Sequence, residues 1–195
     1  MKVGVLSLQG AFREHREAIE ALGAPCVEVR LPEHLSGVDA LVLPGGESTT
    51  MARLLDTSGL REPLREQLRD GMPVLATCAG LILLATEVRD GRADQEPLAI
   101  LDVSVRRNGY GRQRDSFEAP LRIRGLTGAP FPGVFIRAPI VERVGTGVEV
   151  LAELDGHAVL VRRGPVWAST FHPELSGDLR VHERFLQHPT EGATA

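Results

Sequence analysis

The chain has few cysteines and no long apolar run. Only two cysteines occur among its 195 residues, too few for a disulfide scaffold, so we expect a reducing, cytoplasmic setting. Its longest apolar stretch, around 79–85, is far shorter than the roughly 18 residues of a membrane-spanning helix. The N-terminus also lacks the features of a signal peptide. We therefore expect no membrane partner.

An excess of charge is also missing. The 22 Lys and Arg residues nearly balance the 26 Asp and Glu residues, which leaves a formal charge of −4. Such a balance gives no electrostatic reason to expect nucleic acid as a partner. A hydrophobic fraction of 43% and a charged fraction of 25% are typical of a globular protein and argue against disorder, a fibrous protein or a coiled coil.

The first half of the chain alternates between short apolar strands and amphipathic helices. Strands are predicted over four ranges, 2–8, 25–30, 39–43 and 73–77. Helices are predicted over 11–22, 48–56, 60–70 and from residue 79 to about Glu87. This alternation is typical of βαβ units and predicts a parallel sheet with helices on both faces.

The second half consists mainly of strand-like segments separated by Gly, Pro and Asn. They are predicted over 98–105, 117–124, 133–137, 148–154, 157–163 and 165–171, before a final helix over 178–187. No internal repeat or linker divides the chain. We expect a single three-layer α/β domain over residues 1–188, with a parallel central sheet and a more antiparallel second half. A disordered tail is expected over 189–195.

Cys78 is the first candidate for chemistry. Ligands of an open parallel sheet bind beyond the carboxyl ends of its strands, and Cys78 directly follows the strand 73–77. The small residues around it permit the tight turn of a nucleophile elbow, and the N-terminus of the next helix favours a thiolate. A buried structural cysteine is the alternative, and it is the interpretation that we favour for Cys26.

His172 and Glu174 follow the last predicted strand. In an extended segment residues two apart point the same way, and Pro173 holds the backbone extended, so we expect the two side chains to project together. A carboxylate beside an imidazole fixes its tautomer and leaves the other nitrogen for a thiol, which predicts a triad with Cys78. The alternative is a solvated histidine near a helix start. The remaining histidines have no comparable neighbouring residues in the sequence. We assign them to surface or structural roles: His15, His34, His157, His182 and His188.

A glycine-rich turn follows the strand 39–43. The pair Gly45 and Gly46 lets backbone N–H groups approach a substrate, and Ser48 is expected to cap the next helix. Backbone donors of Gly46 and Ala79 would form an oxyanion hole for a tetrahedral intermediate. A phosphate-binding loop is disfavoured, because neither Gly-Lys-Ser/Thr nor the Rossmann glycine spacing is present.

Together these turns resemble those of the triad-type (class I) glutamine amidotransferases, which implies their flavodoxin-like fold. The resemblance narrows to the PdxT family, the glutaminase subunits of pyridoxal 5′-phosphate synthase, and covers nearly the whole chain. It is carried by residues 8–11 with 14–15, 44–50, 77–80, 107–108 with 111–113, 115–118, 135–139 and 171–175. The segments 44–50, 107–118 and 135–139 are more specific than the triad.

The resemblance implies a role for each matching residue. It makes Cys78 the nucleophile, with His172 and Glu174 as its relay. A planar guanidinium suits the α-carboxylate of glutamine, and backbone groups near Ile136 suit the rest of the amino-acid head. The implied glutamine pocket is lined by Gly46, Glu47, Ser48, Arg107, Ile136 and Arg137.

The implied reaction is hydrolysis of L-glutamine to L-glutamate and ammonia through a glutamyl thioester on Cys78, with no metal and no cofactor. His172 would protonate the departing ammonia. Ammonia loses its nucleophilicity when protonated at neutral pH, so the resemblance implies a closed path to a PdxS-type synthase partner that makes pyridoxal 5′-phosphate. We expect that partner to assist the oxyanion site at the turn Gln9-Gly10, which lies near the cleft in this topology.

Two features of the sequence depart from the family pattern. Ala76 stands where this family often has glycine, and the segment 90–96 is charged and looped.

Three other functions are alternatives to this interpretation. One rival is the glutaminase subunit of another synthase, such as imidazole glycerol phosphate synthase, against which 46–50 and 135–139 argue. A cysteine peptidase or hydrolase on the same fold is a second rival. A catalytically dead interaction subunit is a third, which the intact triad residues make a poor explanation.

Overall fold

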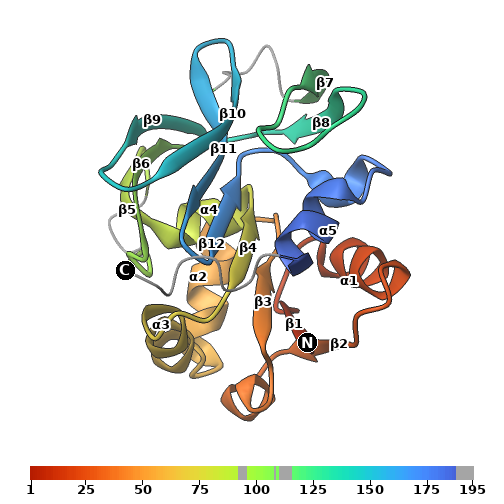
Figure 1. The fold of residues 1–195 in the computed structure, drawn as a ribbon. Coiled ribbons are helices and arrows are strands. Elements are labelled where there is room, and N and C mark those ends of the chain that lie inside the picture. The colour runs from red at the N-terminus through yellow and green to blue at the C-terminus, as the bar shows by residue number, and fades with distance from the viewer. Residues whose placement is uncertain (92–95, 108, 110–115, 188–195) are drawn as a thin grey trace.

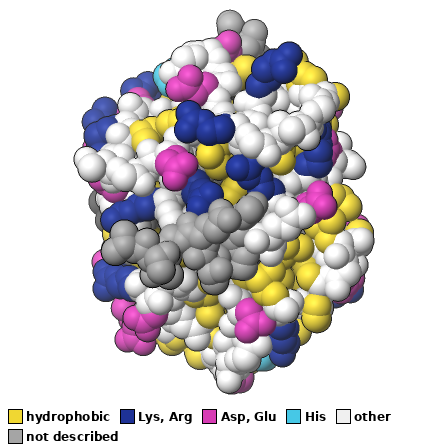
Figure 2. All heavy atoms as spheres, viewed as in Figure 1, with side chains coloured by type: hydrophobic (Ala, Val, Ile, Leu, Met, Phe, Trp, Pro, Cys, Tyr) yellow, Lys and Arg dark blue, Asp and Glu magenta, His cyan; other side chains and the backbone are white. Residues whose placement is uncertain are grey.

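The computed structural model describes residues 1–91, 96–107, 109 and 116–187 (Figure 1). The predicted loop at 90–96 and the motif at 107–118 therefore lie partly outside the described residues, and the tail at 189–195 lies wholly outside them. Within the described residues, no helix is long and apolar enough to cross a membrane. Basic and acidic side chains are interspersed on the face shown in Figure 2.

The central sheet has seven strands in the order β10-β11-β12-β4-β3-β1-β2. Its parallel strands are β1 (Val3–Leu6), β2 (Cys26–Val29), β3 (Ala40–Leu43), β4 (Val74–Thr77) and β12 (Val166–Ser169). The antiparallel strands β10 (Glu149–Leu154) and β11 (His157–Arg163) extend one edge. The expected parallel sheet with an antiparallel second half is confirmed.

Helices cover both faces of this sheet, as Figure 1 shows. They are α1 (Phe12–Ala21), α2 (Ser48–Thr57), α3 (Arg61–Arg69), α4 (Ala79–Leu84) and α5 (Arg180–Gln187), with 3-10 turns η1 (Pro32–Leu35) and η2 (Pro173–Leu175). Alternate residues of each strand enter different cores, because side chains alternate across a sheet. Leu41 and Leu43 pack in the core that includes α2, α3 and α4, whereas Ala40 and Val42 pack in the core that includes α1 and α5.

Two smaller sheets lie outside the central one. A three-stranded sheet contains β5 (Ala85–Arg89), β6 (Leu101–Arg106) and β9 (Ile140–Val144), and a hairpin contains β7 (Ser116–Leu121) and β8 (Phe131–Ile136). The helix predicted to reach about Glu87 is wrong at its end: α4 stops at Leu84, because Ala85 turns extended and β5 pairs with β6. The strand β9 was not predicted, since only Val141 in it is buried and the alternation is weak.

Cys26 was expected to be a buried structural residue. It lies instead on the edge strand β2, where it is half-buried against the core that contains α1. An edge strand is covered on fewer sides than the strands beside it, so a strand pattern alone overestimates its burial.

Candidate active site

Cys78 lies on a strained turn between β4 and α4. Its φ of 48° and ψ of −100° are rare for a residue with a side chain, and such strain concentrates at functional sites. The backbone N–H of Cys78 donates to Ser169 O on the neighbouring strand β12 at 2.8 Å, which fixes the turn against the sheet. The residue is only 6% exposed. This is the geometry expected of a nucleophile elbow.

His172 and Glu174 are in contact, although not for the predicted reason. The segment from Pro173 to Leu175 is a 3-10 turn rather than extended chain. This turn folds the carboxylate back to the ring, where Glu174 Oε1 lies 2.7 Å from His172 Nδ1. The backbone N–H of His172 donates to Val134 O in β8 at 2.8 Å, so the hairpin helps to position the ring.

The charges of this triad support one another. Burial opposes the charge on His172, but hydrogen bonds to Cys78 and Glu174 and the charges of those two groups raise its pKa to about 10. Burial also opposes ionisation of Glu174, yet His15 and His172 together lower its pKa. An imidazolium between a carboxylate and a thiol favours the thiolate as a nucleophile.

Two glycines allow the chain to close around the imidazole. A Cβ atom on Gly45 would collide with the ring of His172. Gly10 has a φ of +98°, and a Cβ there would collide with the carbonyl oxygen of Gly45, which accepts from the N–H of Ala11 at 2.9 Å. The turns at Gly10 and Gly45 therefore pack backbone against backbone at the floor of the site.

A cleft of about 310 Å³ opens above Cys78, and every predicted site residue lines it except Glu174 and Ala79. Glu174 lies behind His172, and Ala79 is the first residue of α4, so its N–H has no partner within that helix. The predicted residues that line the cleft are Gln9, Gly10, Gly46, Glu47, Ser48, Cys78, Arg107, Ile136, Arg137 and His172. Sequence reasoning missed Ile82 and Leu175, although Ile82 follows Cys78 by one helical turn.

Glu47 and Arg107 form an ion pair across the cleft, with Arg107 Nη2 3.1 Å from Glu47 Oε1. The carboxylate of Glu47 also accepts from the N–H groups of Thr49 at 3.2 Å and Thr50 at 2.7 Å. Glu47, and not Ser48, therefore caps α2, and the predicted cap at Ser48 is wrong. A longer carboxylate at this position reaches the free N–H groups of the first turn. Burial opposes the charge of Glu47, but these donors and Arg107 lower its pKa.

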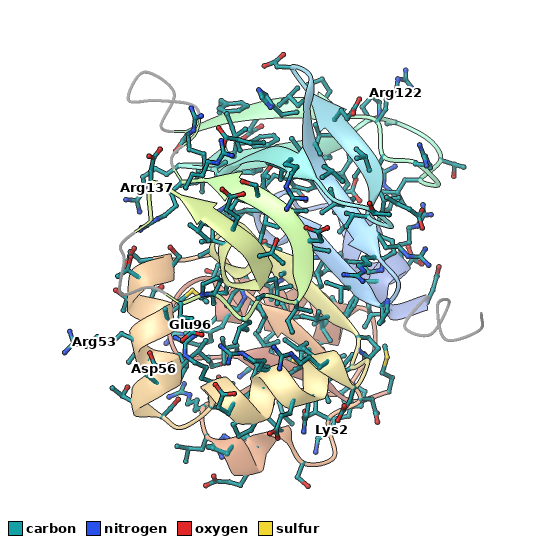
Figure 3. The ribbon with its side chains drawn as sticks, turned by 90° about the vertical axis from the view of Figure 1, so that its left-hand side faces the viewer. Lys2, Arg53, Asp56, Glu96, Arg122 and Arg137 are labelled. Atoms are coloured by element: carbon teal, nitrogen blue, oxygen red, sulfur yellow. The ribbon has the colours of Figure 1, made fainter. Side chains whose placement is uncertain are left out.

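Ser48 and the end of β8 complete the cleft wall. Ser48 is buried, and its Oγ has no hydrogen-bond partner among the described residues. The carbonyl oxygen of Ile136 lies 3.9 Å from Cys78 Sγ. Arg137 follows with a φ of 44°, and Figure 3 shows it on the side of the molecule that also carries Arg53. Strained backbone thus occurs at Cys78 itself and at Arg137, directly after the carbonyl group that faces the thiol.

Two histidines assigned to surface or structural roles lie beside the triad. His15 of α1 and His182 of α5 are both buried, and His15 Nε2 lies 3.2 Å from Glu174 Oε2. Their proximity depends on the packing of α1 against α5, which the sequence pattern did not reveal. In the part of the chain that the structure describes, no cluster of three or more His, Cys, Asp or Glu residues is placed to hold a metal ion.

Comparisons with known proteins show similarity over nearly the whole chain. The model of the SNO glutamine amidotransferase family matches residues 5–191. A protein of Roseiflexus sp. (strain RS-1) named pyridoxal 5′-phosphate synthase subunit PdxT is 54% identical over 187 residues, which are 95% of this chain and 99% of that protein. A protein of the same name from Streptomyces coelicolor is 55% identical and covers 94% of this chain and 91% of its own length.

Solved structures show the same fold. One titled as a glutamine amidotransferase superposes with a TM-score of 0.90 at 50% identity, covering 96% of this chain and 98% of that one. PurLQS from Thermotoga maritima, at 18% identity and a TM-score of 0.64, covers 95% of this chain and 97% of its matched chain. The second likeness shows the fold alone.

Proposed function

Because the chain belongs to the SNO glutamine amidotransferase family, we propose that its cleft hydrolyses L-glutamine through a covalent bond to Cys78. It acts as the glutaminase subunit of pyridoxal 5′-phosphate synthase, the name that relatives at 54–55% identity carry. The observation that carries the mechanism is the strained Cys78 elbow facing a buried imidazolium, His172, which Glu174 supports.

The reaction begins from an ion pair in which His172 Nε2 already holds the proton that the Cys78 thiol has given up. The thiolate attacks the side-chain amide carbon of glutamine, and the C=O π electrons move to the oxygen. Backbone N–H groups of Gly46 and Ala79 hold that oxyanion. The intermediate collapses as His172 gives its proton to the leaving nitrogen, which releases ammonia and leaves a glutamyl thioester.

Water completes the cycle. His172, now neutral, takes a proton from a water molecule as its oxygen attacks the thioester carbon. The C–S bond breaks, the thiolate returns to its place beside the imidazolium, and glutamate leaves the cleft. Glu174 remains ionised throughout, because its role is to orient the ring and stabilise the charge on it.

The rim of the cleft recognises the amino-acid head of the substrate. Arg107 and Arg137 offer guanidinium groups for the α-carboxylate, while Glu47 and the carbonyl of Ile136 offer acceptors for the α-ammonium. The unpaired Oγ of the buried Ser48 supports this assignment, since a buried hydroxyl without a partner is costly unless a ligand satisfies it.

A PdxS-type synthase takes up the ammonia, and it docks at the turn Gln9-Gly10. Support for this docking site comes from Gln9, whose side-chain carbonyl accepts from the N–H of Glu47 at 2.7 Å. That hydrogen bond joins the turn to the residue directly after Gly46, so a partner pressing on Gln9 would act on the oxyanion site.

Ammonia release from glutamine tests the proposal, with the wild type and Cys78→Ala each measured with and without a PdxS-type synthase. We expect release that the synthase stimulates and that Cys78→Ala abolishes. Cys26→Ser is the matched control and should release ammonia at the wild-type rate. Equal release from Cys78→Ala would overturn the nucleophile assignment, whereas release indifferent to the synthase would favour the glutaminase subunit of another synthase.

A further inference from the structure

A second set of buried side chains stands behind the triad. Glu174 has a fully buried side chain, and its two oxygens face different histidines: Oε1 faces His172 Nδ1 at 2.7 Å, and Oε2 faces His15 Nε2 at 3.2 Å. His15 Nδ1 in turn lies 2.9 Å from Nε2 of His182, which is also buried. A continuous chain of close polar contacts thus runs from Cys78 through His172, Glu174 and His15 to His182.

The charge of Glu174 favours one direction along this chain. A ring lone pair 3.2 Å from an ionised carboxylate oxygen would be repelled, so the proton of the neutral His15 ring is favoured on Nε2, where it donates to Thr77 Oγ1 at 3.1 Å with Glu174 Oε2 beside it. His15 Nδ1 is then an acceptor, and the N–H at Nε2 of His182 donates to it. The remaining nitrogen of His182, Nδ1, must be bare, and it has no hydrogen-bond partner among the described residues. The opposite arrangement would aim a lone pair of His15 at the carboxylate.

Both histidines are held neutral. Burial lowers the pKa of His15, and the charge of His172 lowers it further. The charges of Glu174 and Glu14 act in the opposite direction but do not outweigh burial. Burial also lowers the pKa of His182 to about 3. Each ring therefore carries a single proton at neutral pH, as the directed chain requires.

Glu174 Oε2 has no hydrogen-bond partner among the described residues, so the His15 ring beside it provides the electrostatic support for that oxygen. Without this support the buried carboxylate would be destabilised and would tend to take up a proton or rotate away. Either change would weaken its hold on His172. Thr77 also lies on this junction, with its Oγ1 3.1 Å from His15 Nε2, and it directly precedes Cys78. The cluster thus joins α1, β4, η2 and α5 at one point beneath the elbow.

We propose that His15 and His182 are positioning residues for the glutaminase reaction. The hydrogen bond from His182 orients the His15 ring beside Glu174 Oε2, where it stabilises the ionised carboxylate and thereby keeps His172 charged and aimed at Cys78. This inference rests on the proposed function, because it assumes that Cys78 is the nucleophile.

The test measures how fast iodoacetamide alkylates Cys78 as a function of pH, since only the thiolate reacts. Burial raises the pKa of Cys26 to about 11, and Cys26→Ser serves as the parent so that one thiol is followed. In the parent we expect Cys78 to react faster than a free thiol at the same pH, because the imidazolium of His172 faces the sulfur. In His15→Leu the profile should move to higher pH by about one unit, a roughly tenfold slower reaction at a fixed acidic pH.

Two variants separate positioning from packing. His15→Gln keeps an N–H group that can lie beside Glu174 and Thr77 and an acceptor for His182, so it should recover most of the parent profile. Ile19→Ala removes buried volume from the same helix, one turn away, without touching the chain of hydrogen bonds, and should leave the profile in place. Turnover with the synthase should agree: His15→Leu lowers kcat about tenfold and leaves the KM for glutamine within about twofold of the parent value.

The outcomes are distinct. A parent thiol with ordinary reactivity would contradict the proposed function. A reactive parent with an unmoved profile in His15→Leu, or an equal shift in Ile19→Ala, would overturn the positioning role alone. If His15→Leu does not fold, the decision falls on His182→Leu, which removes the hydrogen bond to His15 and should shift the profile in the same direction by a smaller amount.

Discussion

The base of the cleft and its rim use charge in opposite ways. At the base, the side chain of Glu174 is 0% exposed and is held between two histidines. At the rim, the side chains of Glu47 and Arg107 are 40% and 19% exposed, and they pair with each other across the opening. Water screens the rim but not the base, so each hydrogen bond at the base has the larger effect.

This difference separates the two tasks of a hydrolase. Groups that stabilise the transition state need a fixed geometry before the substrate arrives, which burial and several partners provide. Groups that recognise the substrate must exchange partners on each turnover, which a partly hydrated ion pair permits. Changes at the base should therefore lower kcat, and changes at the rim should mainly raise KM.

The largest effect is expected for Glu174→Gln. An amide in this position keeps the shape of the side chain but removes the charge that stabilises the imidazolium of His172. We expect kcat to fall about a thousandfold or more, as when the carboxylate of a catalytic triad is replaced by an amide. Steady-state ammonia release with the synthase measures it. A loss below about tenfold would mean that the base of the cleft is no more sensitive than the rim.

Gly45→Ala should rank second. The added methyl group would collide with the imidazole of His172, so the ring must move away from Cys78. A small displacement of a catalytic group costs about a hundredfold in rate, and we expect a kcat loss of that order with the fold retained. Circular dichroism checks the fold. Unchanged turnover would show that the ring tolerates movement.

A change at the rim tests the other side of the comparison. Glu47→Gln removes the charge that faces Arg107 and weakens the cap of α2, which contributes about 1 kcal/mol to stability. We expect the KM for glutamine to rise about tenfold while kcat changes less than threefold. A fall in kcat comparable to that of Glu174→Gln would remove the distinction between rim and base.

The smallest effect is on the pH dependence of stability. His182 is neutral in the folded protein with a pKa of about 3, whereas an unfolded histidine takes up a proton below about pH 6.5. The unfolded state therefore binds more protons as pH falls, and stability is lost from about pH 6.5 downward. Between pH 7 and pH 5, His182→Leu should lose about 2 kcal/mol less than the wild type in urea denaturation. His34→Gln, an exposed control, should behave as the wild type does.

The sequence predicted the fold class and most of the residues that the structure brings together at the cleft, for a physical reason. Cys78, Gly46 and Arg107 follow strands or belong to turns, and the alternation of strands and helices places the carboxyl ends of parallel strands at one edge. The motif 44–50 and the pair His172 and Glu174 then fall beside Cys78. These are local patterns whose meeting point depends on topology alone.

Other features depended on packing that no local pattern records. His15 and His182 are 167 residues apart, and only the docking of α5 on α1 brings their rings to 2.9 Å. The all-apolar run of α4 continues into β5 without a break signal, so its end at Leu84 could not be located. Capping of α2 by Glu47 instead of Ser48 depends on side-chain reach.

The central claim is that Cys78 becomes covalently bonded to the substrate. In the most direct test, an electrophilic diazoketone analogue of glutamine is added to the complex that this chain forms with the synthase. The modified peptide is then mapped by mass spectrometry. The account predicts one modification, on Cys78, that glutamine prevents and that matches the loss of ammonia release. Inactivation with the label on Cys26 or elsewhere, and Cys78 unmodified, would contradict it.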